Sequence, residues 1–346
     1  MDLSREYAED CDRISSKDYP WERMSGQSIL ITGATGMVGS VLADILASKV
    51  DEYGFDVTVL SRNDKSLFNR FSNITSERFH RLSHDVNNPL SDSFDSIFHF
   101  ASNTHPRMYA LDPIGTISTN VLGLKNLLDS YSGEKGGRFV FASSVEIYGQ
   151  NRGDVEAFDE TYSGYIDCNT VRAGYNESKR VGEALCQAYG VQNGVDFIIP
   201  RLSRLYGPTV RLDDSKAISQ FIFGGLSGKD VVLKSKGDQL FSYCYVFDAV
   251  DAILHLYFNG ITGEAYNISG RESDVTLNEL AGMIADITGV NVVHDIPDEV
   301  ESKGFSKATK AILDIEKIRA IGWSPEYSLK DGLKRTINSL SSMQDI

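Results

Sequence analysis

Tyr175 and Lys179 stand four residues apart in the segment AGYNESKR, and this spacing suggests proton-transfer chemistry. On a helix, side chains four residues apart share one face. An ammonium group beside a phenol favours the phenolate and lowers the pKa of the phenol. Such a phenol can remove the proton of a sugar hydroxyl while hydride leaves the same carbon, and it can return the proton on reduction. Because the YxxxK pattern alone is common, an exposed helix face is the alternative interpretation.

A second polar group follows the apolar run RFVFA, in the segment SSVEIYG at residues 143–149. Ser144 supplies a hydroxyl that could bind the same oxygen as Tyr175. Glu146 could act as a base on a proton made acidic by a neighbouring ketone, or it could accept backbone hydrogen bonds in a purely structural role. Val145 carries no titratable group, so an elimination that needs both an acid and a base from this segment is disfavoured.

The turn GATGMVG, at residues 33–39, joins the apolar run SILIT to a stretch with helical periodicity. In this context, glycines permit a tight turn, let the backbone approach a pyrophosphate and let the helix pack on the strand. The helix N-terminus then faces the phosphate charge. We therefore predict dinucleotide binding, with contacts from Gly33, Thr35, Gly36, Met37, Val38 and Gly39.

The end of the second strand indicates which cofactor is bound. Ser61 stands 22 residues after Gly39, and Arg62 follows it, where an acidic residue would bind the ribose 2′-hydroxyl of NAD. A hydroxyl and a guanidinium would instead hold a 2′-phosphate, so we predict NADP(H) in preference to NAD(H). The alternative is an exposed arginine at a strand end. Asp85 and Val86 are placed to meet the adenine.

These residues fall at the ends of apolar segments that alternate with helical ones. Strands are expected at 28–33, 56–63, 95–102, 138–144 and 194–202, and helices at 39–50, 119–131 and 177–190. Such alternation predicts an α/β fold, a Rossmann-type doubly wound parallel sheet with helices on both faces. Ligands then bind outside the carboxyl ends of the strands.

After about residue 205 the segments become shorter and more mixed. We expect a lead-in at residues 1–26, an NAD(P)-binding Rossmann domain at 27–205, and a smaller mixed α/β C-terminal lobe at 206–346. The lead-in is polar and helical, with YPWERM as its anchor. The C-terminal lobe is expected to be partly discontinuous and mainly to bind substrate.

Composition narrows the classes of partner and the location. The formal net charge of −14 repels nucleic acid and anionic membranes, so neither is an expected partner. The four cysteines form no CxxC pair and no histidine cluster accompanies them, so we expect no metal site and reduced thiols in a cytoplasmic protein. The acidic N-terminus is unlike a signal peptide, and no run reaches the ~18 apolar residues of a membrane span.

Together these segments resemble the extended short-chain dehydrogenase/reductase family, and within it the NAD(P)-dependent nucleotide-sugar epimerases, dehydratases and decarboxylases. The resemblance covers about residues 27–330 and rests on the glycine turn, HFAS, TNVLG, SSVEIYG, YNESK, RLSRLYGP, YCYVFDAV, GEAYNISG and IGWSP. It implies a nicotinamide cofactor, a nucleotide-diphosphate sugar between the lobes, and a homodimer formed through a helix bundle. It also implies transient oxidation at a sugar carbon, usually C4, by Tyr175, Lys179 and Ser144.

The resemblance adds further cofactor contacts. These are Phe100, Ala101, Ser102, Asn120 and Pro200, together with Tyr175 and Lys179 of the catalytic group. Asn120 is a polar residue inside an apolar helical stretch, so a side chain satisfied locally within a bent helix is the alternative interpretation.

The sequence departs from the family pattern near the expected substrate. The family usually has Asn where Arg204 stands and Arg where Phe241 stands, both contacting the substrate diphosphate, so a relocated guanidinium or a different substrate is expected. The family's dehydratases carry Asp-Glu, and its UDP-glucuronate decarboxylases Ser-Glu, where Val145 and Glu146 stand. Further substrate candidates are His105, Arg107, Arg211 and Lys310. A loop histidine and solvated surface cations are the alternatives for this last group.

Four functional hypotheses remain open. The first is an epimerase that oxidises and re-reduces its sugar without net redox. The second is an NADPH-dependent net reductase of a keto-sugar or nucleotide-linked ketose, which Ser61, Arg62 and Val145 favour. The third is a dehydratase or UDP-glucuronate decarboxylase-like enzyme, which Val145 disfavours. The fourth is a non-catalytic NADP(H)-sensing protein, against which the Ser144, Tyr175 and Lys179 set argues.

Overall fold

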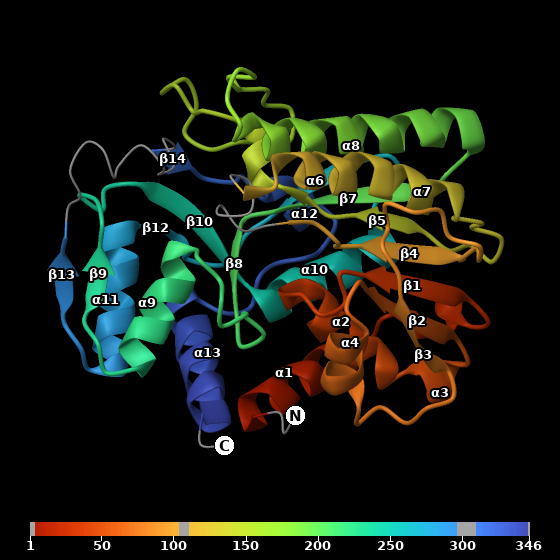
Figure 1. Ribbon diagram of the computed structural model, residues 1–346, viewed down its shortest axis with the longest axis horizontal. Coiled ribbons are helices and arrows are strands. Elements are labelled where there is room, and N and C mark those ends of the chain that lie inside the picture. The colour runs from red at the N-terminus through yellow and green to blue at the C-terminus, as the bar shows by residue number, and fades with distance from the viewer. Residues whose placement is uncertain (1–3, 104–110, 296–308, 345–346) are drawn as a thin grey trace.

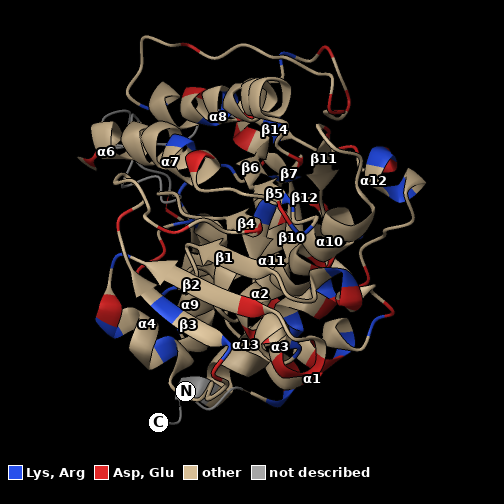
Figure 2. Ribbon diagram, turned by 90° about the vertical axis from the view of Figure 1, so that its right-hand side faces the viewer, with Lys and Arg blue, Asp and Glu red and all other residues tan. Residues whose placement is uncertain are grey.

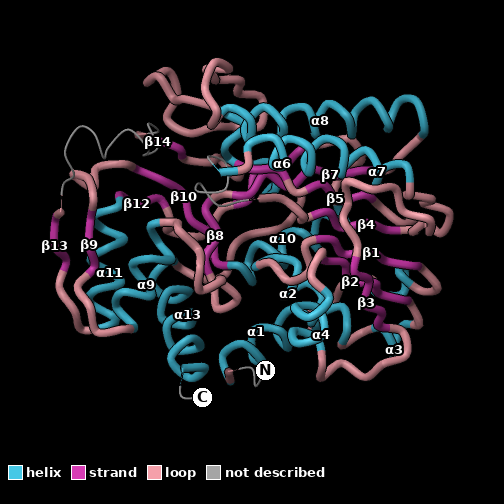
Figure 3. The backbone as a smooth tube through the Cα atoms, in the orientation of Figure 1, coloured by secondary structure: helices cyan, strands magenta, loops and turns pink. Residues whose placement is uncertain are grey.

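The computed structural model describes residues 4–103, 111–295 and 309–344. A large parallel sheet with helices above and below it occupies one half of the molecule in Figure 1, and a smaller mixed part with short strands occupies the other. The tube in Figure 3 shows the same division, with the long strands stacked between two groups of helices. The N- and C-terminal ends lie close together below the junction of the two parts.

The large sheet is built from short apolar strands. Its members are β1 (Ser28–Thr32), β2 (Asp56–Ser61), β3 (Phe79–Ser83), β4 (Ser96–His99), β5 (Phe139–Phe141), β6 (Ser143–Ser144), β7 (Phe197–Leu202) and β11 (Ala265–Ile268). The order is β11-β7-β5-β4-β1-β2-β3, with β6 paired to β7. All of these pairs are parallel. The strand order reverses between β1 and β4, as in doubly wound Rossmann folds, so the predicted fold class is confirmed.

Helices cover both faces of this sheet. One face carries α2 (Met37–Ala47) and α10 (Val246–Asn259), and α4 (Asp64–Phe71) packs against β2 and β3. The other face carries α6 (Pro113–Ser118), the π-helical turn η2 (Thr119–Gly123), α7 (Leu124–Asp129) and the long α8 (Ala173–Asn193). The short α3 (Val50–Tyr53) ends at Gly54, before β2 begins. Because helices cover both faces, β1 and β4 are almost entirely buried, their polar Thr32, Ser96 and His99 included.

The smaller part contains two further sheets. One joins β8 (Arg204–Tyr206), β10 (Leu240–Tyr245), β12 (Asp274–Thr276) and β14 (Lys310–Ala311), and the other pairs β9 (Val231–Leu233) with β13 (Val292–His294). Its helices are α9 (Ala217–Leu226), α11 (Leu277–Thr288), α12 (Glu316–Ala320) and α13 (Leu329–Gln344). Because β11 and α10 also come from this half of the chain, residues 206–346 contribute to both parts. The three-part division of the chain stays a prediction.

Charged residues lie mainly on the outer helices and loops, as Figure 2 shows for α1 and α12, whereas β1 carries none. Among the described residues, no helix has the length and apolar character needed to cross a bilayer. The same residues contain no group of three or more His, Cys, Asp or Glu side chains arranged to hold a metal. All four cysteines are free thiols. The cytoplasmic location and the homodimer stay predictions.

The lead-in is an integral part of the fold. It forms α1 (Arg5–Ser15) and the 3-10 turn η1 (Trp21–Met24), and α1 packs against α2, α10 and α13. Asp10 on α1 is fully buried. Its carboxylate accepts hydrogen bonds from the hydroxyls of Tyr245 (2.8 Å) and Tyr327 (2.6 Å) and from Nε of Arg335 (2.9 Å). One buried carboxylate therefore ties α1 to β10 and α13.

We expect Asp10→Ala to lower the free energy of unfolding by about 3 kcal/mol, because the half-buried Arg335 guanidinium and two tyrosine hydroxyls lose their acceptor. Urea denaturation followed by circular dichroism measures this change. Arg5→Ala is the control, because the Arg5–Glu9 ion pair is exposed at the surface. Equal denaturation midpoints for the two variants would contradict the proposed anchoring.

Candidate active site

The glycine turn forms a cradle at the carboxyl end of β1. Gly33 has a φ of +65°, and a Cβ atom there would lie 2.7 Å from the backbone nitrogen of Ala101. A Cβ atom on Gly39 would lie 2.5 Å from the carbonyl oxygen of Gly33. Gly36 is the N-cap of α2, which begins at Met37. Side chains at these positions would fill or distort the turn, so the backbone fits the close approach of a pyrophosphate at a helix N-terminus.

The other predicted contacts within the turn lie where the sequence places them. Met37 and Val38 begin α2, and Thr35 precedes them in the turn. The hydroxyl of Thr35 lies 3.4 Å from that of Ser61 at the end of β2. Arg62 follows and is exposed. The ends of β1 and β2 thus lie side by side, and Arg62 is the next residue along the chain.

Asp85 and Val86 follow β3 at the same edge of the sheet. The carboxylate of Asp85 accepts a hydrogen bond from the backbone nitrogen of Asn87 (3.0 Å), which shapes a turn. Val86 is buried, and its carbonyl accepts a hydrogen bond from Nδ2 of Asn126 (2.9 Å). Gly123 of the π-helical turn leaves room for the Val86 side chain. This strand end is therefore packed directly against the helices that follow β4.

Asn120 connects the end of β4 to α8. It is fully buried in η2, and its Oδ1 accepts a hydrogen bond from Ser102 (2.7 Å). Its Nδ2 donates to Ser178 (2.8 Å), whose hydroxyl donates to the carbonyl of Tyr175 (2.9 Å). These partners lie far from Asn120 in sequence, so the alternative of a locally satisfied side chain is wrong. The π turn places the amide between Ser102 and Ser178.

Lys179 and Tyr175 lie on the first turns of α8, on its buried side. Nζ of Lys179 donates a 2.8 Å hydrogen bond to the carbonyl of Ala142 and lies 4.8 Å from the ring centroid of Phe141. The lysine is 3% exposed and the tyrosine 5%. Burial lowers the pKa of Lys179 to about 8, although the carboxylate of Glu183 opposes this shift. An ammonium group whose pKa is about 8 can exchange a proton near neutral pH.

In the segment SSVEIYG, some side chains hold the fold together and others lie at the predicted site. It forms β6 and the 3-10 turn η3 (Val145–Tyr148). Ser143 donates to Glu183 (2.6 Å) and Tyr148 donates to Asn267 (2.6 Å), so both serve the fold. Ser144 is partly exposed, and its Oγ accepts a hydrogen bond from the backbone nitrogen of Glu146 (3.3 Å). Val145 is buried with the hydrophobic core.

Glu146 lies among three donor groups. Its Oε2 accepts a hydrogen bond from Nδ2 of Asn176 (3.3 Å) and lies 3.8 Å from Nη2 of Arg172. Its Oε1 lies 3.8 Å from Nη2 of Arg204. These contacts place the Glu146 carboxylate against the first turns of α8, the helix that carries Tyr175 and Lys179. Asn176 and Arg172 were not predicted from the sequence; the only signal was the position of Asn176 within YNESK.

The predicted substrate contacts fall into separate places. Arg204 and Phe241 come together, with the guanidinium carbon 3.6 Å from the ring centroid. Arg211 forms an exposed ion pair with Asp213, and Lys310 on β14 pairs with Glu156 (2.7 Å). His105 and Arg107 lie outside the described residues. Of these candidates, only Arg204 directly faces Glu146 in the described parts of the chain.

The remaining predicted cofactor contacts line the strand ends or the core. Phe100 and Ala101 follow β4 and face Gly33, and Pro200 is buried inside β7. His99, which was not predicted, is buried below this edge with Nδ1 2.8 Å from the hydroxyl of Thr32. Burial, with the nearby Lys179 charge, lowers the pKa of His99 to about 3, so the imidazole is neutral.

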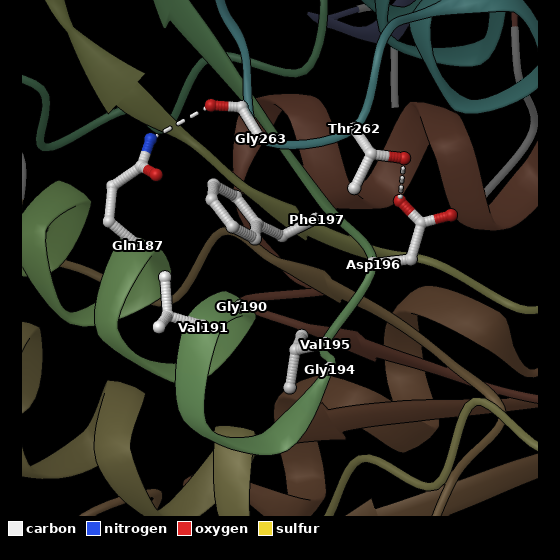
Figure 4. Close-up of a pocket in the computed structure, with 9 residues that line it drawn as sticks. All are labelled: Gln187, Gly190, Val191, Gly194, Val195, Asp196, Phe197, Thr262 and Gly263. Carbon is white, nitrogen blue, oxygen red and sulfur yellow. Dashed lines mark hydrogen bonds between the residues drawn. The ribbon is translucent and has the colours of Figure 1, made fainter.

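The hollow in Figure 4 lies elsewhere. It is bordered by the C-terminal end of α8 and by the start of β7, where Gln187 donates to the carbonyl of Gly263 (2.8 Å). Its volume is about 350 Å³. Because it adjoins the amino end of β7, it is separate from the carboxyl edge that carries Ser144, Tyr175 and the glycine turn.

We expect Gly39→Ala to weaken cofactor binding about tenfold, because the new methyl group would displace α2 from the turn that approaches the pyrophosphate. Fluorescence titration with NADH and NADPH measures the dissociation constants. Gly282→Ala on α11 is the matched control, since a Cβ atom there meets nothing within 4 Å. Unchanged cofactor affinity in Gly39→Ala would refute the predicted role of the turn.

Comparison with known proteins supports the same family. The model of the NAD dependent epimerase/dehydratase family matches residues 29–269. UDP-glucuronic acid decarboxylase 1 of Xenopus tropicalis is 30% identical over 348 residues, covering 96% of this chain and 78% of the relative. UDP-glucuronic acid decarboxylase 5 of Arabidopsis thaliana is 32% identical over 314 residues, covering 89% and 88%.

A solved structure with a similar fold also matches most of the chain. The dTDP-glucose 4,6-dehydratase of Streptomyces venezuelae, solved with NAD bound, matches with a TM-score of 0.76 and 26% identity, covering 92% of this chain and 98% of that one. The family match extends from β1 to the residue after β11, and so includes the glycine turn, SSVEIYG and YNESK. The chain is therefore a member of the NAD-dependent epimerase/dehydratase family of nucleotide-sugar enzymes, as its ordered motifs predicted.

Proposed function

We propose that this protein decarboxylates a nucleotide-linked uronic acid, with UDP-glucuronate as the favoured substrate, through transient oxidation of the sugar ring. The observation that carries the proposal is the arrangement at the carboxyl edge of the sheet. There Tyr175, Lys179 and Ser144 supply one set of proton-transfer groups, and Glu146, two residues after Ser144, adds a carboxylate at the same strand end. The decarboxylase names of two relatives that cover most of the chain support this choice over the predicted epimerase.

The chain's own residues suit the oxidation step. A bound nicotinamide cofactor would supply the hydride acceptor and return the hydride at the end of the cycle. Tyr175 takes the proton of the reacting hydroxyl, and Ser144 binds the same oxygen. Lys179, buried and hydrogen-bonded to Ala142, supplies positive charge that favours the phenolate. The three groups together hold the developing ketone oxygen.

After this oxidation, decarboxylation needs few catalytic groups from the protein. Oxidation at C4 places a ketone on the carbon bonded directly to C5. Since C5 bears the carboxylate, the oxidised sugar is a β-keto acid. The C5–carboxylate bond breaks, CO2 leaves, and the bonding electrons move onto the ketone oxygen as an enolate, which Tyr175 and Ser144 stabilise. One proton added to C5 regenerates the ketone, and the returned hydride with one proton gives the alcohol. No base is required to start the loss of CO2.

Val145 therefore has a different meaning from the one expected. An elimination of water requires both removal of a proton and protonation of the leaving hydroxyl, so Val145 still disfavours a dehydratase. Decarboxylation requires only a single proton donor, and Glu146 or Tyr175 suffices for it. In this proposal Val145 does not count against the decarboxylase alternative, because that reaction does not need an acid and base pair.

We expect the purified protein to convert UDP-glucuronate into a UDP-pentose and CO2 without net change in reduced nicotinamide. Tyr175→Phe should lower kcat by about 10²- to 10⁴-fold while leaving cofactor affinity unchanged, because only the proton acceptor is lost. Release of labelled CO2 and chromatography of the nucleotide sugar measure the reaction. Cofactor titration of the variant controls for folding.

Other outcomes identify the other hypotheses. A UDP-uronate epimer formed without CO2 would support the epimerase instead. Stoichiometric loss of NADPH absorbance with a keto-sugar would support the net reductase. Cofactor binding without turnover of any nucleotide sugar, combined with unchanged cellular function of Tyr175→Phe, would support the NADP(H)-sensing protein.

We further propose that the chain prefers NADP(H) to NAD(H). The support is that β2 ends at Ser61, within 3.4 Å of Thr35, and that the exposed Arg62 follows directly. A guanidinium and hydroxyls favour a 2′-phosphate, whereas a carboxylate here would favour the free ribose hydroxyl.

We expect Arg62→Ala to weaken NADPH binding about tenfold while changing NADH binding less than twofold, since only NADPH carries the 2′-phosphate. Arg78→Ala is the charge-matched control, because Arg78 pairs with Asp56 at the opposite edge of the sheet. Tighter binding of NADH than NADPH by the unmodified protein would exclude the preference.

A further inference from the structure

The guanidinium of Arg204 is held on an aromatic ring inside the predicted site. Arg204 begins β8, and Phe241 lies on the neighbouring strand β10. The guanidinium carbon lies 3.6 Å from the centroid of the Phe241 ring, and the ring is 5% exposed. An arginine stacked on a ring keeps its five N–H donors in the plane of the guanidinium, pointing away from the ring. The stack therefore fixes the position of the charge and leaves its edge available.

That edge is not satisfied by the protein. Nη1 of Arg204 is buried and has no hydrogen-bond partner in the described parts of the chain. Nη2 lies 3.8 Å from Oε1 of Glu146, which is too long for a hydrogen bond. Burial lowers the pKa of Arg204 even though Glu146 acts in the opposite direction. A buried guanidinium donor without an acceptor is costly, so this edge is suited to an anionic ligand.

The local charge favours an anion. Arg172 and Arg204 approach the two oxygens of one carboxylate, Glu146, each at 3.8 Å. Two guanidinium groups therefore approach the same carboxylate. Neither ion pair has hydrogen-bond length, so a second carboxylate can form charge-assisted bonds with Arg204 without first breaking a tight contact.

The location indicates which part of a substrate would meet this charge. Glu146 is two residues beyond Ser144 and accepts a hydrogen bond from Asn176, the neighbour of Tyr175. Glu146 therefore links Arg204 to the segment that carries Ser144 and to the helix that carries Tyr175. Those groups act on the sugar ring, so a substituent carried on the ring is the part of the substrate within reach of Arg204.

We propose that Arg204, fixed on Phe241, binds the sugar carboxylate of the substrate and makes the enzyme selective for nucleotide-linked uronic acids. The inference rests on the proposed decarboxylase function. It assigns to β8 a specificity-determining guanidinium whose acceptor is the carboxylate that leaves as CO2. The substrate diphosphate is the other anionic group that the same guanidinium could bind, and the experiment below separates the two.

Binding is measured in the Tyr175→Phe background with saturating cofactor, so that ligands are not consumed. Isothermal titration compares UDP-glucuronate with UDP-xylose, which has the same nucleotide and ring but no carboxylate. We expect the Tyr175→Phe protein to bind UDP-glucuronate more tightly. Adding Arg204→Met should weaken UDP-glucuronate binding about 10- to 100-fold and UDP-xylose binding less than twofold, because only the carboxylate contact is lost. Arg319→Met, on α12, is the charge-matched control.

Two further variants guard against misfolding. Arg204→Lys keeps the charge but loses the planar fork, so it should bind UDP-glucuronate more weakly while its Tm and cofactor affinity stay unchanged. The double change Arg204→Asn with Phe241→Arg moves the guanidinium to the facing strand and should recover part of the preference for UDP-glucuronate. If a guanidinium at position 241 restores the preference for UDP-glucuronate, the role of Arg204 is electrostatic and not one of packing.

Three results would overturn the inference. Equal weakening of both ligands by Arg204→Met would assign Arg204 to the diphosphate. Unchanged binding of both would leave it with a structural role. In either case a decarboxylase activity of the unmodified protein would stand. If the Tyr175→Phe protein itself shows no preference for UDP-glucuronate, and the unmodified protein releases no CO2, the proposed function fails and the inference fails with it.

Discussion

The hydrogen bond from the buried ammonium of Lys179 to the carbonyl of Ala142 is the contact on which the site depends. It joins the first turns of α8 to the chain directly after β5. Because Tyr175 is one helical turn before Lys179, and Ser144 is two residues after Ala142, this bond holds the turn that carries the phenol beside the strand end that carries the hydroxyl. The lysine is 3% exposed, so its charge acts in a medium that screens it little.

A second layer of polar contacts keeps the strand end in place. Glu183, one turn further along α8, accepts hydrogen bonds from Ser143 (2.6 Å) and from Arg201 on β7 (2.6 Å). Arg201 also donates to the hydroxyl of Tyr148 (3.0 Å). These groups are internally satisfied, so they have little left to offer a substrate. They explain why a motif with four polar or aromatic side chains supplies only Ser144 and Glu146 to the proposed site.

The large sheet and the smaller part of the molecule meet next to Glu146. β7 of the large sheet ends at Leu202, and β8 of the smaller sheet begins at Arg204. A guanidinium from the smaller part therefore faces Glu146, which belongs to the larger part. The proposed reacting groups come from the Rossmann sheet and its helix α8, while the guanidinium proposed to select the sugar comes from the adjoining sheet. Such a division lets substrate selectivity vary without disturbing the oxidation chemistry.

The sequence by itself determined the features that depend on local spacing. The strand and helix alternation, the glycine turn and the shared face of Tyr175 and Lys179 all follow from periodicities of two and 3.6 residues and from the backbone freedom of glycine. The parallel Rossmann sheet could therefore be predicted, and with it the edge at which Ser61, Asp85 and Ser144 gather. Local spacing does not indicate which residues from distant segments come into contact.

Tertiary structure alone decided those partners. It joined β11 to the large sheet, buried Asp10 under β10 and α13, and converted the TNVLG stretch into a π turn that sends Asn120 to Ser102 and Ser178. It also brought Arg204 onto Phe241, so that two departures from the family pattern form one contact. Each of these depends on side chains that meet only when strands and helices pack, and such packing energy is shared among residues far apart in the chain.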